Sequence, residues 1–346
     1  MNFCHPETMI MKTFLALAAL LLVAPLAHAQ LEWRISVKLI ADSGGNPAPN
    51  AFNNISNELV LANQLLDGYG RGYSFDTTEI LTLTGVSQWY NIQARNNSNK
   101  LALQTVARAN PSLYAWRNNA INLYVVNSSS GVCSFSGDGD ELILVGANAY
   151  RTLVLHECGH YFNLNHTHVA EQFLNADNSA CTNGCACARL LPGDMDGVGD
   201  TAPDHECFSS QDAVAVGAYG NFYTNLNATQ QWLTRNTWQN IMSYHDQNVL
   251  SIETPDQLDR STDSANGPRL GVTTGRTRYV ATWGSDAGGN PGTASAARLR
   301  NLSTGVARAD AGDIVLIAGG AYNEPQTLSK AVTLRATRGD ASIGAP

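Results

Sequence analysis

Hydrophobic and polar positions predict strands and helices that interleave along the first half of the chain. Trp33–Ile40 is rich in β-formers, and apolar residues between Asn54 and Leu66 recur at helical spacing. Further strands are predicted at 79–86, 88–94, 121–126, 132–136 and 141–145, and further helices at 101–109, from 151 into the motif at 156–163, and at 231–238. This order predicts an α/β fold. A loop rich in Gly, Asp and Cys follows at 175–210.

The N-terminus carries the pattern of an export signal. Lys12 precedes an apolar stretch from Phe14 to Leu26, and Ala27-His28-Ala29 forms a small-residue cleavage site. A membrane anchor is the alternative, but the stretch is shorter than the roughly 20 apolar residues that span a bilayer. We therefore expect residues 1–29 to be a signal peptide and the protein to be secreted or periplasmic, with no stable membrane anchor.

Composition narrows the class of protein. The chain has 346 residues, 44% of them hydrophobic and 14% charged, which excludes intrinsic disorder and a polytopic membrane protein. A formal net charge of −8 argues against a nucleic-acid surface, because such a surface needs a basic face. The length suggests a catalytic domain with an appendage.

Six cysteines remain after the signal is removed, and an even number in an exported chain predicts disulfides. The candidates are Cys133, Cys158, Cys181, Cys185, Cys187 and Cys207. The last four are expected to pair among themselves. A zinc–thiolate knot of Cys181, Cys185 and Cys187 is the alternative.

One helix carries the candidate chemistry, His156-Glu157-Cys158-Gly159-His160. Residues four apart share a helix face, so His156 and His160 can bind one metal ion with Glu157 beside it. If the chain turns near Asn163, His166 can return as a third ligand and leave the fourth position to water, which is the pattern of a catalytic zinc. A solvated helix face with two histidines is the alternative.

The longer motif resembles the metzincin signature, in which glycine normally stands at the position of Asn163. Asparagine enters the left-handed conformation readily, so the turn is still expected. Asn240-Ile241-Met242-Ser243-Tyr244 resembles the Met-turn of that group, with Met242 as an apolar floor below the metal. Ordinary core packing is the alternative for Met242.

Within the metzincins, the chain resembles the pappalysin family over roughly residues 31–262. The motif at 156–167, the run Asp196-Gly197-Val198-Gly199-Asp200-Thr201-Ala202-Pro203 and the Met-turn carry this resemblance. It implies an α+β catalytic domain with a twisted mixed sheet and an active-site helix. It also implies a zinc endopeptidase with His156, His160 and His166 as ligands, Glu157 as general base and Tyr244 assisting the oxyanion.

The resemblance further implies calcium near the active site. Asp194, Asp196 and Asp200 lie in a Gly-rich loop and are hard oxygen ligands that suit Ca²⁺, with a solvated acidic turn as the alternative. The peptide substrate is expected to pair as an extended strand with 141–145. Specificity is expected from 245–252, and His168, His205 and His245 are not expected to be ligands.

The C-terminal part turns to Gly, Ala, Thr and Val after residue 278. A short helix at 296–308 and strands at 313–317 and 331–335 resemble the start of a right-handed parallel β-helix. The expected organisation is therefore a signal peptide (1–29), a zinc metallopeptidase domain (30–263), a linker (264–277) and a β-helix-like segment (278–346), truncated or marginally folded.

The sequence thus predicts a secreted zinc endopeptidase in which Glu157 activates a zinc-bound water. A non-catalytic adhesin or binding module with a structural metal site is the alternative. An intact Glu157 and an open coordination position argue against it.

Overall fold

The computed structural model describes residues 31–133, 141–148, 151–168, 173–174, 189–190, 196–205 and 208–344. The expected signal peptide lies outside these ranges. Within them, no helix is long and apolar enough to cross a membrane.

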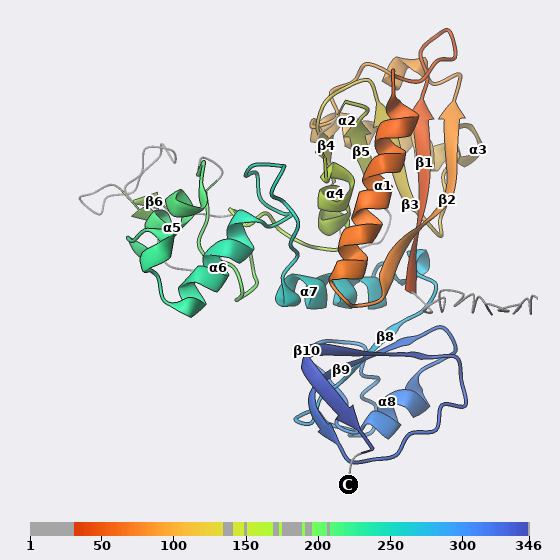
Figure 1. Ribbon diagram of the computed structural model, residues 1–346. Helices are drawn as coiled ribbons and strands as arrows, with labels where there is room; N and C mark the ends of the chain where they lie inside the picture. The colour runs from red at the N-terminus through yellow and green to blue at the C-terminus, as the bar shows by residue number, and fades with distance from the viewer. Residues whose placement is uncertain are drawn as a thin grey trace, which may run out of the picture.

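A five-stranded mixed sheet forms the framework of the first unit (Figure 1). Its strand order is β2-β1-β3-β5-β4, with four parallel strands and one antiparallel edge strand. The bounds are β1 Leu31–Ile40, β2 Tyr73–Leu83, β3 Ile121–Val126, β4 Gly131–Val132 and β5 Leu142–Gly146. Every residue of β3 and β5 is buried, as expected for parallel strands covered on both faces.

Helices cover both faces of this sheet. Alternate residues of β3 face opposite ways: Leu123 joins a core with helices α1 (Ala51–Gly68) and α4 (Leu153–Tyr161), whereas Tyr124 faces α2 (Asn97–Ala109) and α3 (Pro111–Tyr114). The short 3-10 helix η1 (Ser87–Trp89) also packs on the second face. The unit is therefore a three-layer α/β/α arrangement.

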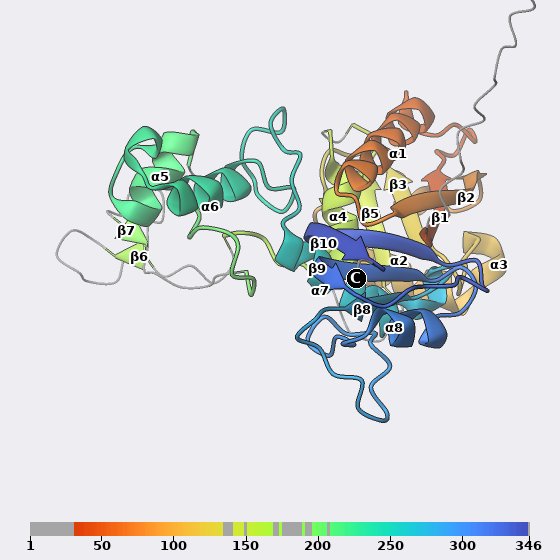
Figure 2. The same ribbon diagram turned by 60° about the horizontal axis from the view of Figure 1, so that its bottom comes forward.

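A helical extension lies to one side of the sheet in two views (Figures 1 and 2). It contains α5 (Gln211–Tyr219), η3 (Tyr223–Asn225) and α6 (Ala228–Trp238), with the two-stranded pair β6 (Phe173–Leu174) and β7 (Arg189–Leu190). Helix α7 (Pro255–Asn266) then leads the chain back below α1 and α4 (Figure 1).

The C-terminal unit packs against the first unit through a shared core. The 3-10 helix η4 (Leu270–Val272) leads into a parallel sheet of order β10-β9-β8, with β8 Thr277–Val280, β9 Ile314–Tyr322 and β10 Thr333–Ile343. Ile314 and Leu316 of β9 join the core of the first unit, whereas Val315 and Ile317 face helix α8 (Leu302–Arg308). One sheet thus serves two cores. Its continuation as a β-helix stays a prediction.

Two sequence predictions in the first unit are wrong. Residues 88–94 form no strand but the end of η1 and the turns after it, and Trp89 Nε1 donates to Tyr114 Oη at 3.0 Å. The edge strand is not 141–145, because β5 is paired on both sides and β4 takes the edge.

Two predictions near the C-terminus also differ from the structure. The helix predicted at 296–308 is shorter, because it begins only at Leu302. The segment expected as a linker, 264–277, begins inside α7 and contains buried residues such as Arg269 and Val272.

Candidate metal centre

Helix α4 carries the motif and is held at both ends by distant residues. At its N-terminus, Thr152 provides no side-chain cap, and Glu58 of α1 instead accepts a hydrogen bond from the Val154 N–H at 2.8 Å. At its C-terminus, Arg269 Nε donates to the Tyr161 carbonyl at 2.9 Å. Partners at helix ends satisfy backbone groups that the helix itself leaves unpaired. The position of the motif is therefore fixed from both ends.

A left-handed residue turns the chain directly after the helix. Asn163 has φ 72°, and the Leu164 N–H bonds back to the Gly159 carbonyl at 2.8 Å. This is the turn expected from the sequence, and it reverses the chain so that His166 returns to the face of α4 that carries His156 and His160.

Three imidazoles meet at this face. His166 Nε2 lies 3.2 Å from His156 Nε2 and 2.9 Å from His160 Nε2. The ligand atoms of these three histidines all lie within 4.8 Å of one another, close enough to hold one metal ion. Among the described residues, no other group of three or more His, Cys, Asp or Glu side chains converges in this way.

The hydrogen bonds of the rings suit metal binding. His156 Nδ1 bonds to the Ile241 carbonyl at 2.7 Å, and His160 Nδ1 bonds to the Leu164 carbonyl at 2.8 Å. Because a carbonyl oxygen can only accept, both Nδ1 atoms carry the proton and both Nε2 lone pairs face the shared centre.

The same rings resist protonation. Burial, with the neighbouring His160, lowers the pKa of His156 to about 3, and burial lowers the pKa of His160 to about 4. The pKa of His166 is also well below its usual range, through burial and the two neighbouring rings. Neutral imidazoles are the form that binds a transition metal, so the residues present fit zinc.

Glu157 lies beside this centre, lines the cleft and is almost fully buried. Its side chain is buried, the Cys133 backbone N–H bonds to it, and its Oε2 atom has no hydrogen-bond partner among the described residues. Burial raises its pKa to about 8 despite that hydrogen bond and the charge of Lys100. A buried carboxyl with one unused oxygen, facing a cleft, is suited to proton transfer.

The Met-turn packs directly beneath the helix. Met242 is fully buried, and a Cβ built on Gly159 would lie 2.4 Å from its Sδ atom, so the two segments can touch only because residue 159 is glycine. Tyr244, two residues further, is 48% exposed, with its ring centroid 4.6 Å from that of His166. Met242 is therefore buried against α4, whereas Tyr244 lines the cleft beside the histidines.

A buried carboxylate ties the segment of the third histidine to the Met-turn. Asp204 accepts from Thr167 Oγ1 at 2.5 Å and bonds to His245 Nε2 at 2.8 Å, and both Asp204 and His245 are buried. Thr167 follows the third histidine and His245 follows Tyr244. The Thr167 N–H also donates to the Met242 carbonyl at 3.2 Å. Sequence reasoning did not single out Asp204, since its partners lie about 40 residues away on either side.

A cleft of about 570 Å³ opens over the centre. Residues 130–133, including edge strand β4, form part of its lining, with Gln247 and Leu250 from the segment after the Met-turn. Asp246 is exposed and is not among the lining residues. His168 stacks on His166 at 4.8 Å between ring centroids but does not belong to the converging group.

The expected calcium ligands are placed only in part. Asp194 lies outside the described residues. Asp196 accepts from its own loop, at the Val198 N–H and the Thr201 hydroxyl, whereas Asp200 accepts from Thr254 Oγ1 and the Asp256 N–H at the start of α7. Both carboxylates are thus engaged in hydrogen bonds, and the calcium site stays a prediction.

The disulfide prediction does not hold where it can be examined. In the described part of the chain there is no disulfide, and Cys133 and Cys158 are thiols buried in the core beside α4. Burial raises the pKa of both thiols, which keeps them protonated and unreactive. The candidates Cys181, Cys185, Cys187 and Cys207 lie outside the described residues.

Comparison with known proteins gives no family assignment. No protein-family profile and no curated protein matches the chain. Among solved structures, it is similar to mature mirolysin of Tannerella forsythia in complex with a cleaved peptide, with 13% identity and a TM-score of 0.38, over 70% of this chain and 95% of that one. A chaperone–substrate complex is similar at 12% identity and a TM-score of 0.30, over 62% of this chain and 36% of that one. Both scores are too low to establish a shared fold, so function is inferred from the residues themselves.

Proposed function

We propose that the chain is an exported zinc endopeptidase of the pappalysin type. The observation that carries this proposal is the convergence of three neutral imidazoles beside one buried glutamate in an open cleft. A structural zinc site is closed by four protein ligands, whereas a catalytic site keeps one position open. In the described residues three side chains converge, which supports the catalytic class.

His156, His160 and His166 would hold the zinc ion through their Nε2 atoms. When bound, zinc supplies a Lewis acid that makes a water molecule acidic near neutral pH and polarises a carbonyl group. Glu157 accepts the proton of the attacking water on its carboxylate and returns it to the leaving amide nitrogen. Tyr244 would donate a hydrogen bond to the developing oxyanion, a role that its exposure and its short ring distance to His166 support.

Edge strand β4 gives the substrate a place to bind. One side of β4 pairs with β5, and β4 also lines the cleft beside Glu157. A Cβ on Gly131 would lie 2.8 Å from Glu157 Oε1, so the strand passes close to the general base. An extended peptide that adds to this edge brings its backbone carbonyl to the centre, independent of its side chains.

The test is peptide hydrolysis by Glu157→Gln. We expect its kcat to fall by about 10³-fold, within the range for loss of a general base, with zinc content unchanged. Glu253→Gln is the matched control: Glu253 is also buried, and burial also raises its pKa to about 8, but it does not line the cleft.

Three outcomes are decisive. Hydrolysis of casein by wild type and Glu253→Gln, with loss in Glu157→Gln, supports the proposal. Equal hydrolysis by all three proteins contradicts the role of Glu157. If zinc is bound but no protein cleaves casein, the alternative of a binding module with a structural metal is favoured.

A further inference from the structure

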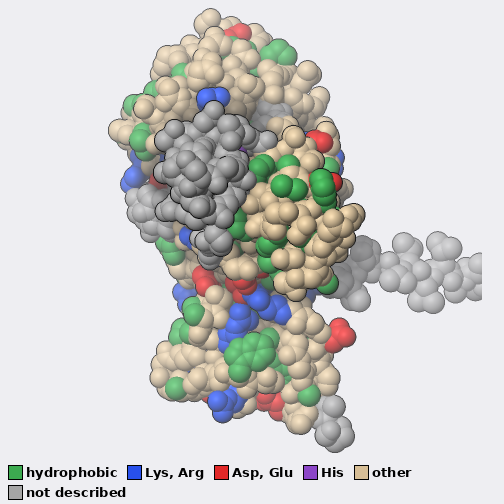
Figure 3. All heavy atoms as spheres, turned by 90° about the vertical axis from the view of Figure 1, so that its left-hand side faces the viewer, with side chains coloured by type: hydrophobic (Ala, Val, Ile, Leu, Met, Phe, Trp, Pro, Cys, Tyr) green, Lys and Arg blue, Asp and Glu red, His purple; other side chains and the backbone are tan. Residues whose placement is uncertain are grey.

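A second hollow lies away from the metal centre, between α7 and the C-terminal unit. We call it the α7 groove. It has a volume of about 770 Å³. Figure 3 shows acidic and basic side chains gathered at the junction of the two units, next to a hydrophobic group. The lining comes from α7, from the turn at Asn163 and residues 197–199, and from the C-terminal unit.

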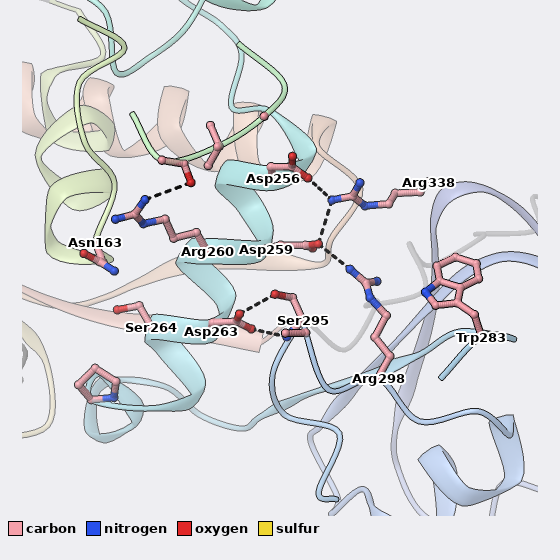
Figure 4. A pocket seen from close by; sticks show the side chains of 15 residues that line it. Asn163, Asp256, Asp259, Arg260, Asp263, Ser264, Trp283, Ser295, Arg298 and Arg338 are labelled. Carbon is pink, nitrogen blue, oxygen red and sulfur yellow. Dashed lines mark hydrogen bonds and ion pairs between the residues drawn. The ribbon is translucent and has the colours of Figure 1, made fainter. Parts of the chain in front are cut away.

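An exposed aromatic ring stands at one end of the groove. Trp283 is 64% exposed, the highest fraction among the exposed large hydrophobic side chains of the described residues. In Figure 4 its indole lies beside Arg298 and Arg338. Leaving an indole in water costs free energy that burial against an apolar surface recovers. The exposed ring therefore indicates a ligand with an apolar face.

The charges that line the groove balance one another. Three carboxylates, Asp256, Asp259 and Asp263, are set against three guanidinium groups, Arg260, Arg298 and Arg338. Arg338 pairs with Asp256 and Asp259, and Arg298 Nη2 donates to Asp259 at 2.8 Å, as the dashed lines of Figure 4 mark. Because the lining carries as many positive as negative side chains, it gives no net attraction to an anion or a cation and favours a neutral ligand.

Two polar atoms of the lining have no hydrogen-bond partner in the part of the chain that the structure describes. Arg298 Nη1 and Ser264 Oγ are both buried, and neither has a hydrogen-bond partner among the described residues. Unpaired buried donors cost roughly 1–3 kcal/mol each and are rare in folded proteins. Both atoms belong to side chains that line the groove. A ligand with several hydroxyls can offer a separate hydrogen-bond partner to each of these two side chains.

We propose that the α7 groove binds a short neutral oligosaccharide. Sugar rings combine the three properties that the lining demands: no net charge, hydroxyls that both donate and accept, and a C–H face that packs on an indole. The volume lies within the roughly 300–1,000 Å³ of ordinary ligand sites, which suits two or three sugar units. This site is independent of the proposed peptidase activity.

Binding is tested by calorimetric titration of the full chain with four neutral trisaccharides and one anionic one. The neutral probes are cellotriose, maltotriose, xylotriose and triacetylchitotriose, and the anionic probe is trigalacturonate. We expect at least one neutral probe to bind and to change tryptophan fluorescence. Trp283→Ala should weaken that binding at least tenfold. Because Trp283 is largely exposed, this variant should fold normally.

Trp232→Ala is the matched control, because Trp232 is also an exposed tryptophan, 39% exposed, but lies on α6 outside the groove. It should leave binding unchanged. Ser264→Ala should weaken binding if the buried hydroxyl contacts the ligand. The proposal is overturned if no neutral probe binds, if only trigalacturonate binds, or if Trp283→Ala binds as tightly as wild type.

Discussion

The histidine cluster and the Asp259 cluster gather ionisable side chains in different ways. Around Asp259, Arg71, Arg298 and Arg338 surround one buried carboxylate at 2.7 to 3.0 Å, so positive and negative charges meet inside the protein. At the metal centre, three imidazoles meet one another, and no acidic side chain of the described residues joins their group. The first cluster pairs opposite charges, whereas the second presents neutral imidazole nitrogens that can bind a metal cation.

The pKa values reflect this difference. Burial alone would raise the pKa of Asp259, but Arg71 and the two other guanidinium groups outweigh it, and the pKa lies below its usual value. At His156 and His160 burial lowers the pKa, and the hydrogen bonds to the Ile241 and Leu164 carbonyls, which raise it, do not outweigh burial. The ion pairs of the Asp259 cluster hold the units together, whereas the three imidazoles of the histidine cluster are available for a metal ion.

The largest effect on stability is expected at the Asp259 cluster. Asp259→Asn leaves buried guanidinium groups without their anion, and we expect a loss of about 3–5 kcal/mol in the free energy of unfolding, measured by chemical denaturation. Zinc content under native conditions should not change. The exposed Asp67→Asn serves as control and should change stability by less than about 0.5 kcal/mol. A loss below 1 kcal/mol for Asp259→Asn would contradict the role given to this cluster.

A smaller effect is expected at Asp204, which supports the histidine cluster. Asp204→Asn weakens the link between Thr167 and His245, and we expect zinc affinity or kcat/KM to fall by about 10–100-fold, as for other residues that orient metal ligands. Competition with a zinc chelator measures the affinity. Asp246→Asn removes the same charge from an exposed site and should leave both quantities unchanged. Equal zinc affinity and activity in the two variants would show that Asp204 positions nothing.

The smallest effect is expected at the turn that returns His166. Asn163→Ala places a residue that avoids positive φ at φ 72°, and we expect a loss of about 1 kcal/mol in stability. Asn163→Gly should keep the wild-type stability, because glycine adopts this conformation freely. Denaturation curves of the two variants give the comparison. If alanine and glycine behave alike, the turn is not left-handed in solution.

The sequence allowed the local parts of the site to be predicted. His156 and His160 are four residues apart on one helix, and β3 is a six-residue run in which Asn122 is the one strongly polar residue, so both follow from short-range pattern. The same reasoning is wrong at 88–94, because its aromatic and aliphatic residues suit a strand but Trp89, Tyr90 and Ile92 pack half-buried in a 3-10 helix and turns.

The supports of the site could not be predicted, because they come from far along the chain. Glu58 and Arg269 contact α4 across 96 and 108 residues. Helix α7 was missed although Thr254, Pro255 and Gln257 form a capping box with proline at the first turn, a signal that was present in the sequence. The helix is largely polar, so it lacks the apolar periodicity from which the other helices are predicted.

X-ray absorption at the zinc edge on purified protein tests the central claim most directly. The account predicts about one zinc ion per chain, bound by three imidazole nitrogens at roughly 2.0–2.1 Å and one oxygen from water. Absence of zinc, sulfur ligands at roughly 2.3 Å, or a shell of four protein ligands would contradict it.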